Sequence, residues 1–267
     1  MNRIHDRNIP SLDIYPNFQS RLVGKVGIRR ALLTALPFIP RHAYHPFACE
    51  IRNAFRRLYH RSGQIRKRFR NDRGLMVNVG CGASGQAGWV NLDLLELPGV
   101  TCVYDCRKSL PFADESVSCI FTEHFLEHID YCEEIPCFIS ECYRVLEPGG
   151  VIRIIVPDAE KYIRAYCEAD WPELARIRPL GPERTDTYFG SKYHTKMELL
   201  NVIFRQDNEH KFAYDFATLQ FVLQCYGFSQ VCQKKFRESS LPQLGIDRPE
   251  RASESLRVEA VKDVSNE

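Results

Sequence analysis

The stretch from Leu75 to Asp93 reads LMVNVGCGASGQAGWVNLD and decides the fold class. It opens with a short apolar run, residues 75–79, that ends in glycine. It closes with a second run, residues 89–93, that ends on an acid. Further short apolar runs follow at 101–105, 117–121 and 151–156. The pattern of residues 125–146 predicts a helix between the last two of them. Short apolar runs alternating with helices predict a parallel sheet covered on its faces, so we expect an α/β fold.

The first run leads directly into Gly80-Cys81-Gly82-Ala83-Ser84-Gly85, which matches G-x-G-x-x-G. Dinucleotide-binding folds carry the same pattern after a strand. In those folds a helix follows the glycines and an acid stands about 20 residues further on, because the pyrophosphate sits on the helix N-terminus. Here Asp93 follows Gly85 by only eight positions. This spacing leaves little room for a helix and disfavours a dinucleotide.

Several motifs occur in order along the chain: VNVGCG (77–82), GWVNLD (88–93), LPFADESV (110–117), EHFLEH (123–128), YRVLEPGG (143–150) and VPD (156–158). Together they resemble the class I S-adenosylmethionine (SAM)-dependent methyltransferases of the type 11 group, over about residues 74–261. The resemblance implies a Rossmann-like, doubly wound sheet of seven strands in the order 3-2-1-4-5-7-6. Strand 7 would be antiparallel, and residues 229–236 and 255–261 would form the last two strands.

The resemblance also implies a cofactor site for SAM. Gly80 and Gly82 would line the methionine part of the cofactor, where a β-carbon would block close approach. Asp93 would bind the ribose, and Asp105 would face the adenine. The complete predicted set of cofactor residues is Asn78, Gly80, Cys81, Gly82, Asp93, Leu94, Asp105, Thr122 and Glu123. The helix that usually follows the first glycine loop is nearly absent, so residues 83–88 receive no assigned contact.

Two histidines follow the strand that would end beside the methyl donor. Methylation of a hydroxyl requires removal of its proton, and histidine is suited to this near neutral pH. His124 and His128 are therefore candidates for the catalytic base, and the choice between them stays open. Asp158 is an alternative base, because it follows the fifth strand at the carboxyl edge where α/β sites form.

The segment from His124 to His128 is also an H-x-x-E-H string. On a helix its two histidines would share a face and could bind zinc, with Glu127 as a base. The position of the string within the ordered motifs favours methyl transfer, and the sequence identifies no third acidic ligand. We therefore expect no metal. His194, His210 and Tyr214 lie in or after the variable stretch of about residues 169–210, and we expect surface or packing roles for them.

Charge is distributed unevenly along the 267 residues. Residues 1–73 hold 16 Lys/Arg and 4 Asp/Glu, a net of +12, whereas residues 74–267 hold 20 and 30, a net of −10. We interpret 1–73 as a basic helical N-terminal segment, with helices near 20–36 and 46–59, and 74–267 as the SAM-binding domain. Arginines that flank an apolar stretch suggest peripheral membrane contact. The segment shows no basic strand interleaved with aromatic residues, which disfavours nucleic acid as a partner.

The 11 cysteines are scattered, and no secretory signal opens the chain. These features favour a reducing cytoplasm, with contact at the inner membrane surface through the basic segment. The sequence thus predicts a methyltransferase that acts on a small-molecule or glycan-like acceptor at oxygen. The alternatives are an NAD-dependent oxidoreductase, a non-catalytic SAM-binding scaffold and, last, a zinc hydrolase. The identity of the acceptor and the oligomeric state are left open.

Overall fold

The structure is a computed structural model that describes residues 51, 64–168, 171–206 and 209–264. The helices expected near 20–36 and 46–59 lie, apart from Ile51, outside the described residues. The basic run before the domain forms the short helix α4 (Gln64–Arg68). Within the described residues, no helix has the length and apolar character needed to cross a membrane.

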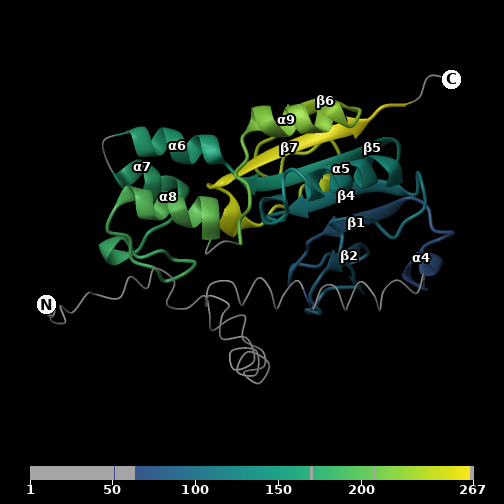
Figure 1. Cartoon of the computed structure of the whole chain (residues 1–267), viewed down its shortest axis with the longest axis horizontal. Coiled ribbons are helices and arrows are strands. Elements are labelled where there is room, and N and C mark those ends of the chain that lie inside the picture. The colour runs from purple at the N-terminus through teal and green to yellow at the C-terminus, as the bar shows by residue number, and fades with distance from the viewer. Residues whose placement is uncertain (1–50, 52–63, 169–170, 207–208, 265–267) are drawn as a thin grey trace, which may run out of the picture.

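A seven-stranded sheet organises the chain (Figure 1). Its strands are β1 (Leu75–Val79), β2 (Val90–Asp93), β3 (Cys102–Val103), β4 (Val117–Glu123), β5 (Leu146–Pro157), β6 (Phe228–Gln233) and β7 (Ser255–Lys262). The order is β3-β2-β1-β4-β5-β7-β6, and β7 runs antiparallel to both β5 and β6. The predicted Rossmann-like topology is therefore confirmed. The strand expected at 101–105 is reduced to two residues, and the fifth strand is longer than expected.

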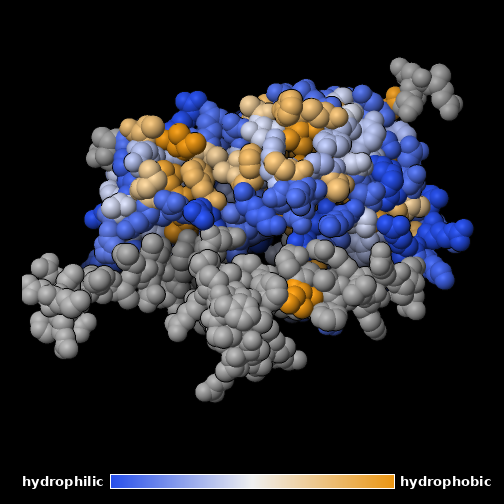
Figure 2. All heavy atoms as spheres, in the orientation of Figure 1, coloured by the Kyte–Doolittle hydropathy of each residue, from blue (hydrophilic) through white to orange (hydrophobic). Residues whose placement is uncertain are grey.

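The helices fall into two groups (Figure 1). The first contains α5 (Glu134–Val145) and α9 (Phe216–Cys225), whose apolar residues pack in the main core with the sheet. The second contains α6 (Ala159–Cys167), α7 (Trp171–Ile177) and α8 (Lys196–Arg205), which share a smaller apolar core of their own at one end of the sheet. Figure 2 shows apolar side chains at the surface over both groups, and Ile163 of α6 and Phe221 of α9 are exposed. Short 3-10 turns occupy Pro182–Arg184, Pro242–Leu244 and Pro249–Arg251.

One predicted element is wrong. The segment 125–146 is not a continuous helix, because it begins with a 3-10 turn, Leu126–His128, and α5 starts only at Glu134. The Asp130 carboxylate accepts hydrogen bonds from the backbone N–H groups of Cys132 and Glu133, which turns the chain between the two elements. Pro136 lies in the first turn of α5, where its missing N–H breaks no helical hydrogen bond.

A buried ion network ties the loop before β7 to the sheet. The Arg153 guanidinium is fully buried on β5 and lies 2.7 Å from Asp247 and 2.7 Å from Glu259 of β7. Because a guanidinium taken out of water needs paired acceptors, this network fixes the path of residues 235–247 across the sheet. That path carries the residues that follow it toward the carboxyl ends of the strands.

A second buried network joins the smaller helical group to β7. Arg178 follows α7 and pairs with Asp186 at 2.9 Å and with Glu254 at 2.6 Å. Glu254 also accepts a hydrogen bond from the Tyr162 hydroxyl at 2.8 Å. The helical group is therefore held at the end of the sheet where β5 finishes and β7 begins.

Candidate active site

The glycine loop leaves β1 in two left-handed turns of backbone. Gly80 has φ +68° and Gly82 has φ +54°, a conformation that side chains with a β-carbon rarely adopt. A β-carbon on Gly80 would lie 2.7 Å from Cδ2 of Phe125, so the packing of Phe125 also requires glycine there. A β-carbon on Gly82 would meet nothing within 4 Å among the described residues. Gly82 therefore borders open space, which a bound ligand can enter.

Asp93 at the end of β2 closes this loop. Its carboxylate accepts the Gly82 N–H through Oδ2 and the Leu95 N–H through Oδ1, both at 2.8 Å. A carboxylate offers about four acceptor positions, so two of them are taken by the backbone. Asp93 is only half-buried, and its remaining positions suit two ribose hydroxyls. Asp93 thus lies beside the open space at Gly82, and its contact with the ribose stays a prediction.

No helix follows the glycine loop, as the spacing predicts. Residues 81–89 form turns, and the N–H groups of Gly80 and Cys81 both donate to the Leu92 carbonyl, at 2.9 and 3.1 Å. These N–H groups are therefore bonded within the protein, and there is no helix N-terminus to receive a pyrophosphate. The loop suits a cofactor that approaches a glycine backbone closely, and it does not suit a dinucleotide.

Asn78 anchors the loop from inside the sheet. It is 3% exposed, and its Nδ2 donates to the Ser84 carbonyl at 3.3 Å and to Oδ1 of Asn91 at 3.4 Å. The same Asn91 oxygen accepts the Gln86 N–H at 2.8 Å. These hydrogen bonds hold residues 84–86 against β1 and β2, so the buried Asn78 side chain stabilises the conformation of the glycine loop.

Two other predicted cofactor residues flank the loop. Leu94 directly follows Asp93 and is half-buried. Asp105 follows β3 and is engaged by Arg107, whose Nε lies 2.9 Å from Oδ1 and whose Nη2 lies 3.0 Å from Oδ2. Arg107 also lies 3.1 Å from Glu134 at the start of α5. Arg107 thus links Asp105 to the start of α5.

The last two predicted cofactor residues end β4. Thr122 is fully buried, and its hydroxyl has no hydrogen-bond partner among the described residues. Glu123 is 7% exposed and accepts two hydrogen bonds from Arg248, from the backbone N–H at 3.2 Å and from Nε at 2.7 Å. The sequence gives no signal for Arg248, because 125 positions separate it from Glu123.

His124 is held on both sides of its ring. It has φ +55°, and its Nε2 lies 2.9 Å from the Ser255 hydroxyl. Ser255 donates its proton to the Arg251 carbonyl, so His124 must donate to Ser255. The other nitrogen, Nδ1, lies 3.1 Å from Oε1 of Glu127. His124 precedes the 3-10 turn, so it does not share a helical face with His128, as the zinc-hydrolase alternative would require.

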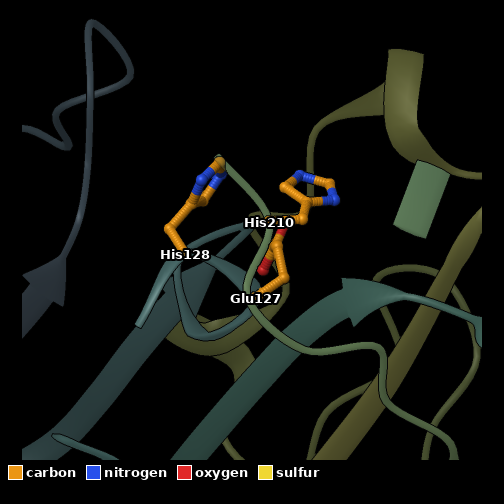
Figure 3. Close-up of side chains that lie close together, drawn as sticks. All are labelled: Glu127, His128 and His210. Carbon is orange, nitrogen blue, oxygen red and sulfur yellow. The ribbon is translucent and has the colours of Figure 1, made fainter. Parts of the chain in front are cut away.

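His128 is instead paired with His210, which comes from the segment before α9 (Figure 3). The two rings meet edge to face with centroids 4.7 Å apart, and the Glu127 carboxylate lies near both of them. His128 Nδ1 lies 3.3 Å from the Glu209 carbonyl and His210 Nδ1 lies 2.5 Å from the Ile203 carbonyl. Since a carbonyl only accepts, each histidine donates from Nδ1, and in the neutral imidazole of that tautomer Nε2 carries the lone pair.

The environment of this cluster shifts the pKa of two of its members. Burial tends to raise the pKa of Glu127, but the contact with His124 and the neighbouring imidazoles prevail and lower it to about 2. Burial lowers the pKa of His210 to about 4, although the Glu127 charge acts in the opposite direction. Near neutral pH this places a buried carboxylate beside an uncharged His210.

Asp158 caps a helix. It lies at the N-cap position of α6, accepts the Lys161 N–H at 3.1 Å, and is 5% exposed. These contacts orient its carboxylate toward the first turn of α6, and the Lys161 ammonium lies 3.4 Å away.

The structure adds His210 and Tyr214 to the residues that the sequence singled out as site candidates. Both border a small cavity that Glu127 also lines, and the buried Tyr214 hydroxyl has no hydrogen-bond partner in the described part of the chain. His194, by contrast, is exposed. A packing role was expected for His210 and Tyr214, because nothing in the sequence connects the segment before α9 with the end of β4.

Comparison with known proteins gives one family match. A family model described as a methyltransferase domain matches residues 95–154, which start just after Asp93 and end within β5. No curated protein matches the chain.

Among solved structures, a SAM-dependent methyltransferase from Archaeoglobus fulgidus is 19% identical, with a TM-score of 0.42, covering 87% of this chain and 99% of that one. A SAM-dependent methyltransferase from Aquifex aeolicus is 17% identical, with a TM-score of 0.39 and coverage of 74% and 88%. The 1,6-didemethyltoxoflavin-N1-methyltransferase of Burkholderia thailandensis, bound to its substrate and S-adenosylhomocysteine, is 14% identical, with a TM-score of 0.42 and coverage of 85% and 93%.

The strand order of the sheet and the methyltransferase-domain match over residues 95–154 support a SAM-dependent methyltransferase with SAM as its cofactor. Within that class, the matched family is the type 11 methyltransferase domain.

Proposed function

We propose that the protein methylates a hydroxyl oxygen of a small-molecule or glycan-like acceptor. SAM supplies an electrophilic methyl group when it is bound. Gly80 and Gly82 would allow the methionine part to approach the backbone, and Asp93 would accept hydrogen bonds from the ribose. The open space beside Gly82 and the acceptor positions left on Asp93 support this placement.

The single observation that carries the proposal is the hydrogen bond from His128 Nδ1 to the Glu209 carbonyl, because the lone pair of the neutral imidazole is then on Nε2. Of the three predicted base candidates, His124 has both nitrogens facing protein groups and Asp158 caps α6. His128 is half-buried, and its Nδ1–H is bonded to the Glu209 carbonyl. Its Nε2 is thus the candidate position that can accept a proton from an acceptor hydroxyl as the oxygen attacks.

The residues around His128 would favour methyl transfer mainly by holding the acceptor oxygen in line with the methyl donor. In many displacement reactions, alignment of acceptor and donor contributes more to the rate than proton removal does, because a bimolecular encounter becomes a reaction between groups that are already held together. The segment before α9 and the helical group α6–α8 lie beside the carboxyl edge and would shape the acceptor pocket. Variable segments of this kind set acceptor choice, whereas the strand ends set the cofactor.

The test is transfer of labelled methyl from SAM to fractions of small molecules and glycans from a cell extract. Transfer to a hydroxyl-bearing fraction, lost in His128→Ala and retained in His194→Ala, would support the proposal. Transfer to nitrogen or carbon would overturn the choice of oxygen. Failure of SAM and S-adenosylhomocysteine to bind the folded protein would overturn the cofactor placement.

We also propose that the basic segment 1–73 contacts an anionic membrane surface. Its net charge of +12 against −10 for the rest of the chain supports this partner.

A further inference from the structure

We propose that Glu127, His128 and His210 form a binding site for one zinc-type divalent metal ion. One ligand atom from each of these residues lies within 4.8 Å of the other two. Figure 3 shows the three side chains converging from the turn after β4 and from the segment before α9. The site goes beyond methyl transfer, and it differs from the sequence expectation that the protein has no metal.

The Glu127 carboxylate is the first reason for the proposal. It is 1% exposed, and within the described ranges its Oε2 has no hydrogen-bond partner, whereas Oε1 faces His124. His124 Nδ1 is near Oε1, at 3.1 Å, and the Lys211 and Phe212 N–H groups bond only to the Glu127 backbone carbonyl. A buried carboxylate with free acceptor positions is costly unless a cation or several hydrogen bonds compensate it.

The second reason is the orientation of the two imidazoles. Each donates its Nδ1–H to a backbone carbonyl, His128 to Glu209 and His210 to Ile203. Metal-binding histidines are commonly oriented in this way, because a hydrogen bond at one nitrogen fixes the tautomer and directs the other lone pair to the metal. Both Nε2 atoms are therefore prepared as ligands.

The third reason is the space beside the carboxylate. A cavity of about 10 Å³ is lined by Glu127, His210 and Tyr214 together with apolar neighbours. That volume accommodates about one water molecule. The Tyr214 hydroxyl is buried and has no partner among the residues described, so a water or hydroxide on the metal could hydrogen-bond to it.

The donor set indicates which kind of ion the site would bind. Two imidazole nitrogens and one carboxylate oxygen suit zinc and similar transition metals, whereas calcium and magnesium prefer oxygen ligands alone. Tetrahedral zinc with Zn–N distances of about 2.1 Å places its ligand atoms about 3.4 Å apart. Side-chain rotations that bring the ligand atoms together by about 1 Å would complete the site. The fourth position would remain open to the cavity.

This set is not the one that the H-x-x-E-H string suggests. His124 faces Ser255 and is not a member, and Glu127 is a ligand where the string would make it a base. His128 Nε2 has a single lone pair, so it serves either the metal or the proton transfer proposed above. In a metal-loaded protein, the open position would bind the acceptor hydroxyl oxygen and lower the pKa of that hydroxyl, so that its proton passes to solvent water and His128 is not needed as the base.

The experiment is a zinc titration of the full-length, chelator-treated protein against a chromophoric competitor, without SAM. We expect one zinc bound per chain, weakened at least about tenfold in His128→Ala and in His210→Ala. His194→Ala is the matched control, because this histidine is exposed and outside the cluster, and it should bind zinc like the unaltered chain. Equal binding by His210→Ala and the unaltered chain would overturn the site, because it would place the zinc on other histidines or cysteines.

Cobalt(II) gives a second readout that requires no variant. Bound at two nitrogens and a carboxylate, it should show the visible absorption of a four- or five-coordinate ion without a thiolate charge-transfer band. An octahedral spectrum or a thiolate band would overturn the assignment. Because both measurements omit SAM, failure of the metal site can be distinguished from failure of methyl transfer. Methyl transfer by protein that binds no zinc would overturn the metal and leave His128 as the base.

Discussion

The sharpest prediction concerns Asp93, because one carboxylate both closes the glycine loop and is placed to bind the ribose. Asp93→Ala removes the acceptor for the Gly82 and Leu95 N–H groups, each bonded at 2.8 Å. Hydrogen bonds to a charged acceptor are worth about 1.5–3 kcal/mol each when buried. Asp93 is half-buried and water can replace part of this, so we expect a loss of about 2 kcal/mol in the free energy of unfolding.

The effect on binding should add to the effect on folding. Two ribose hydroxyls would lose their acceptor, which weakens SAM and S-adenosylhomocysteine by about 1–3 kcal/mol, or about 5- to 150-fold. Calorimetric titration measures this directly, and denaturant unfolding measures the change in stability. Adenosine carries the ribose without the methionine part, so its affinity should fall by a similar factor. Asp93→Asn keeps one oxygen acceptor and should lose less on both measures.

Asp114→Ala is the matched control, because Asp114 is 76% exposed and pairs with Arg144 away from the loop. It should bind S-adenosylhomocysteine like the unaltered protein, and neither should bind NAD. The reasoning is refuted when folded Asp93→Ala binds S-adenosylhomocysteine with unaltered affinity. Loss of S-adenosylhomocysteine binding with full retention of adenosine binding would show that Asp93 shapes the loop without contacting the ribose.

Three further predictions follow from the buried groups and the charge distribution. Burial lowers the pKa of His210 from 6.5 to about 4. Between these pH values the unfolded, metal-free chain therefore binds more protons than the folded chain. The free energy of unfolding should drop by about 3 kcal/mol as the pH falls through that window. Denaturant unfolding across pH 4–7 measures this change. His210→Asn should make the free energy of unfolding less dependent on pH, and His194→Asn should leave its pH dependence unchanged. An unchanged pH dependence in His210→Asn would contradict the prediction. Arg153→Met leaves Asp247 with Arg257 as its cation and Glu259 with Lys234 at 3.8 Å, so it should cost about 3 kcal/mol of stability, the lower end for a broken buried pair. Arg164→Met, in an exposed pair, should change the stability little, and equal effects of the two substitutions in thermal unfolding would contradict the role of the buried network. The full chain should float with anionic liposomes and a chain beginning at Arg73 should not, so equal flotation would remove the membrane proposal.

The sequence predicted the fold and the turn after β1 well because both depend on local patterns. A buried parallel strand is a short apolar run, and the left-handed turn after it needs glycine, so residues 75–93 carry their structure in their own composition. The short distance from Gly85 to Asp93 predicted the missing helix for the same reason. The predicted helix from 125 was wrong because Asp130 accepts backbone N–H groups and starts a new element, a local competition that apolar spacing does not reveal.

Only the tertiary structure decided which groups contact each of the candidate base residues. His124 and His128 are equivalent as histidines after a strand, yet one lies between Ser255 and Glu127 while the other meets His210. Glu127 is a local neighbour of His124, but Ser255 and His210 are 131 and 82 positions away from the histidines that they contact. Contacts at such separations follow from the packing of β7 and the segment before α9 against the end of β4. The sequence by itself determined the sheet, the glycine loop and the acid that closes it, because strand periodicity and backbone conformation are properties of neighbouring residues. Which histidine nitrogen faces a carbonyl, and which groups surround the buried Glu127 carboxylate, depends on residues that only folding brings together.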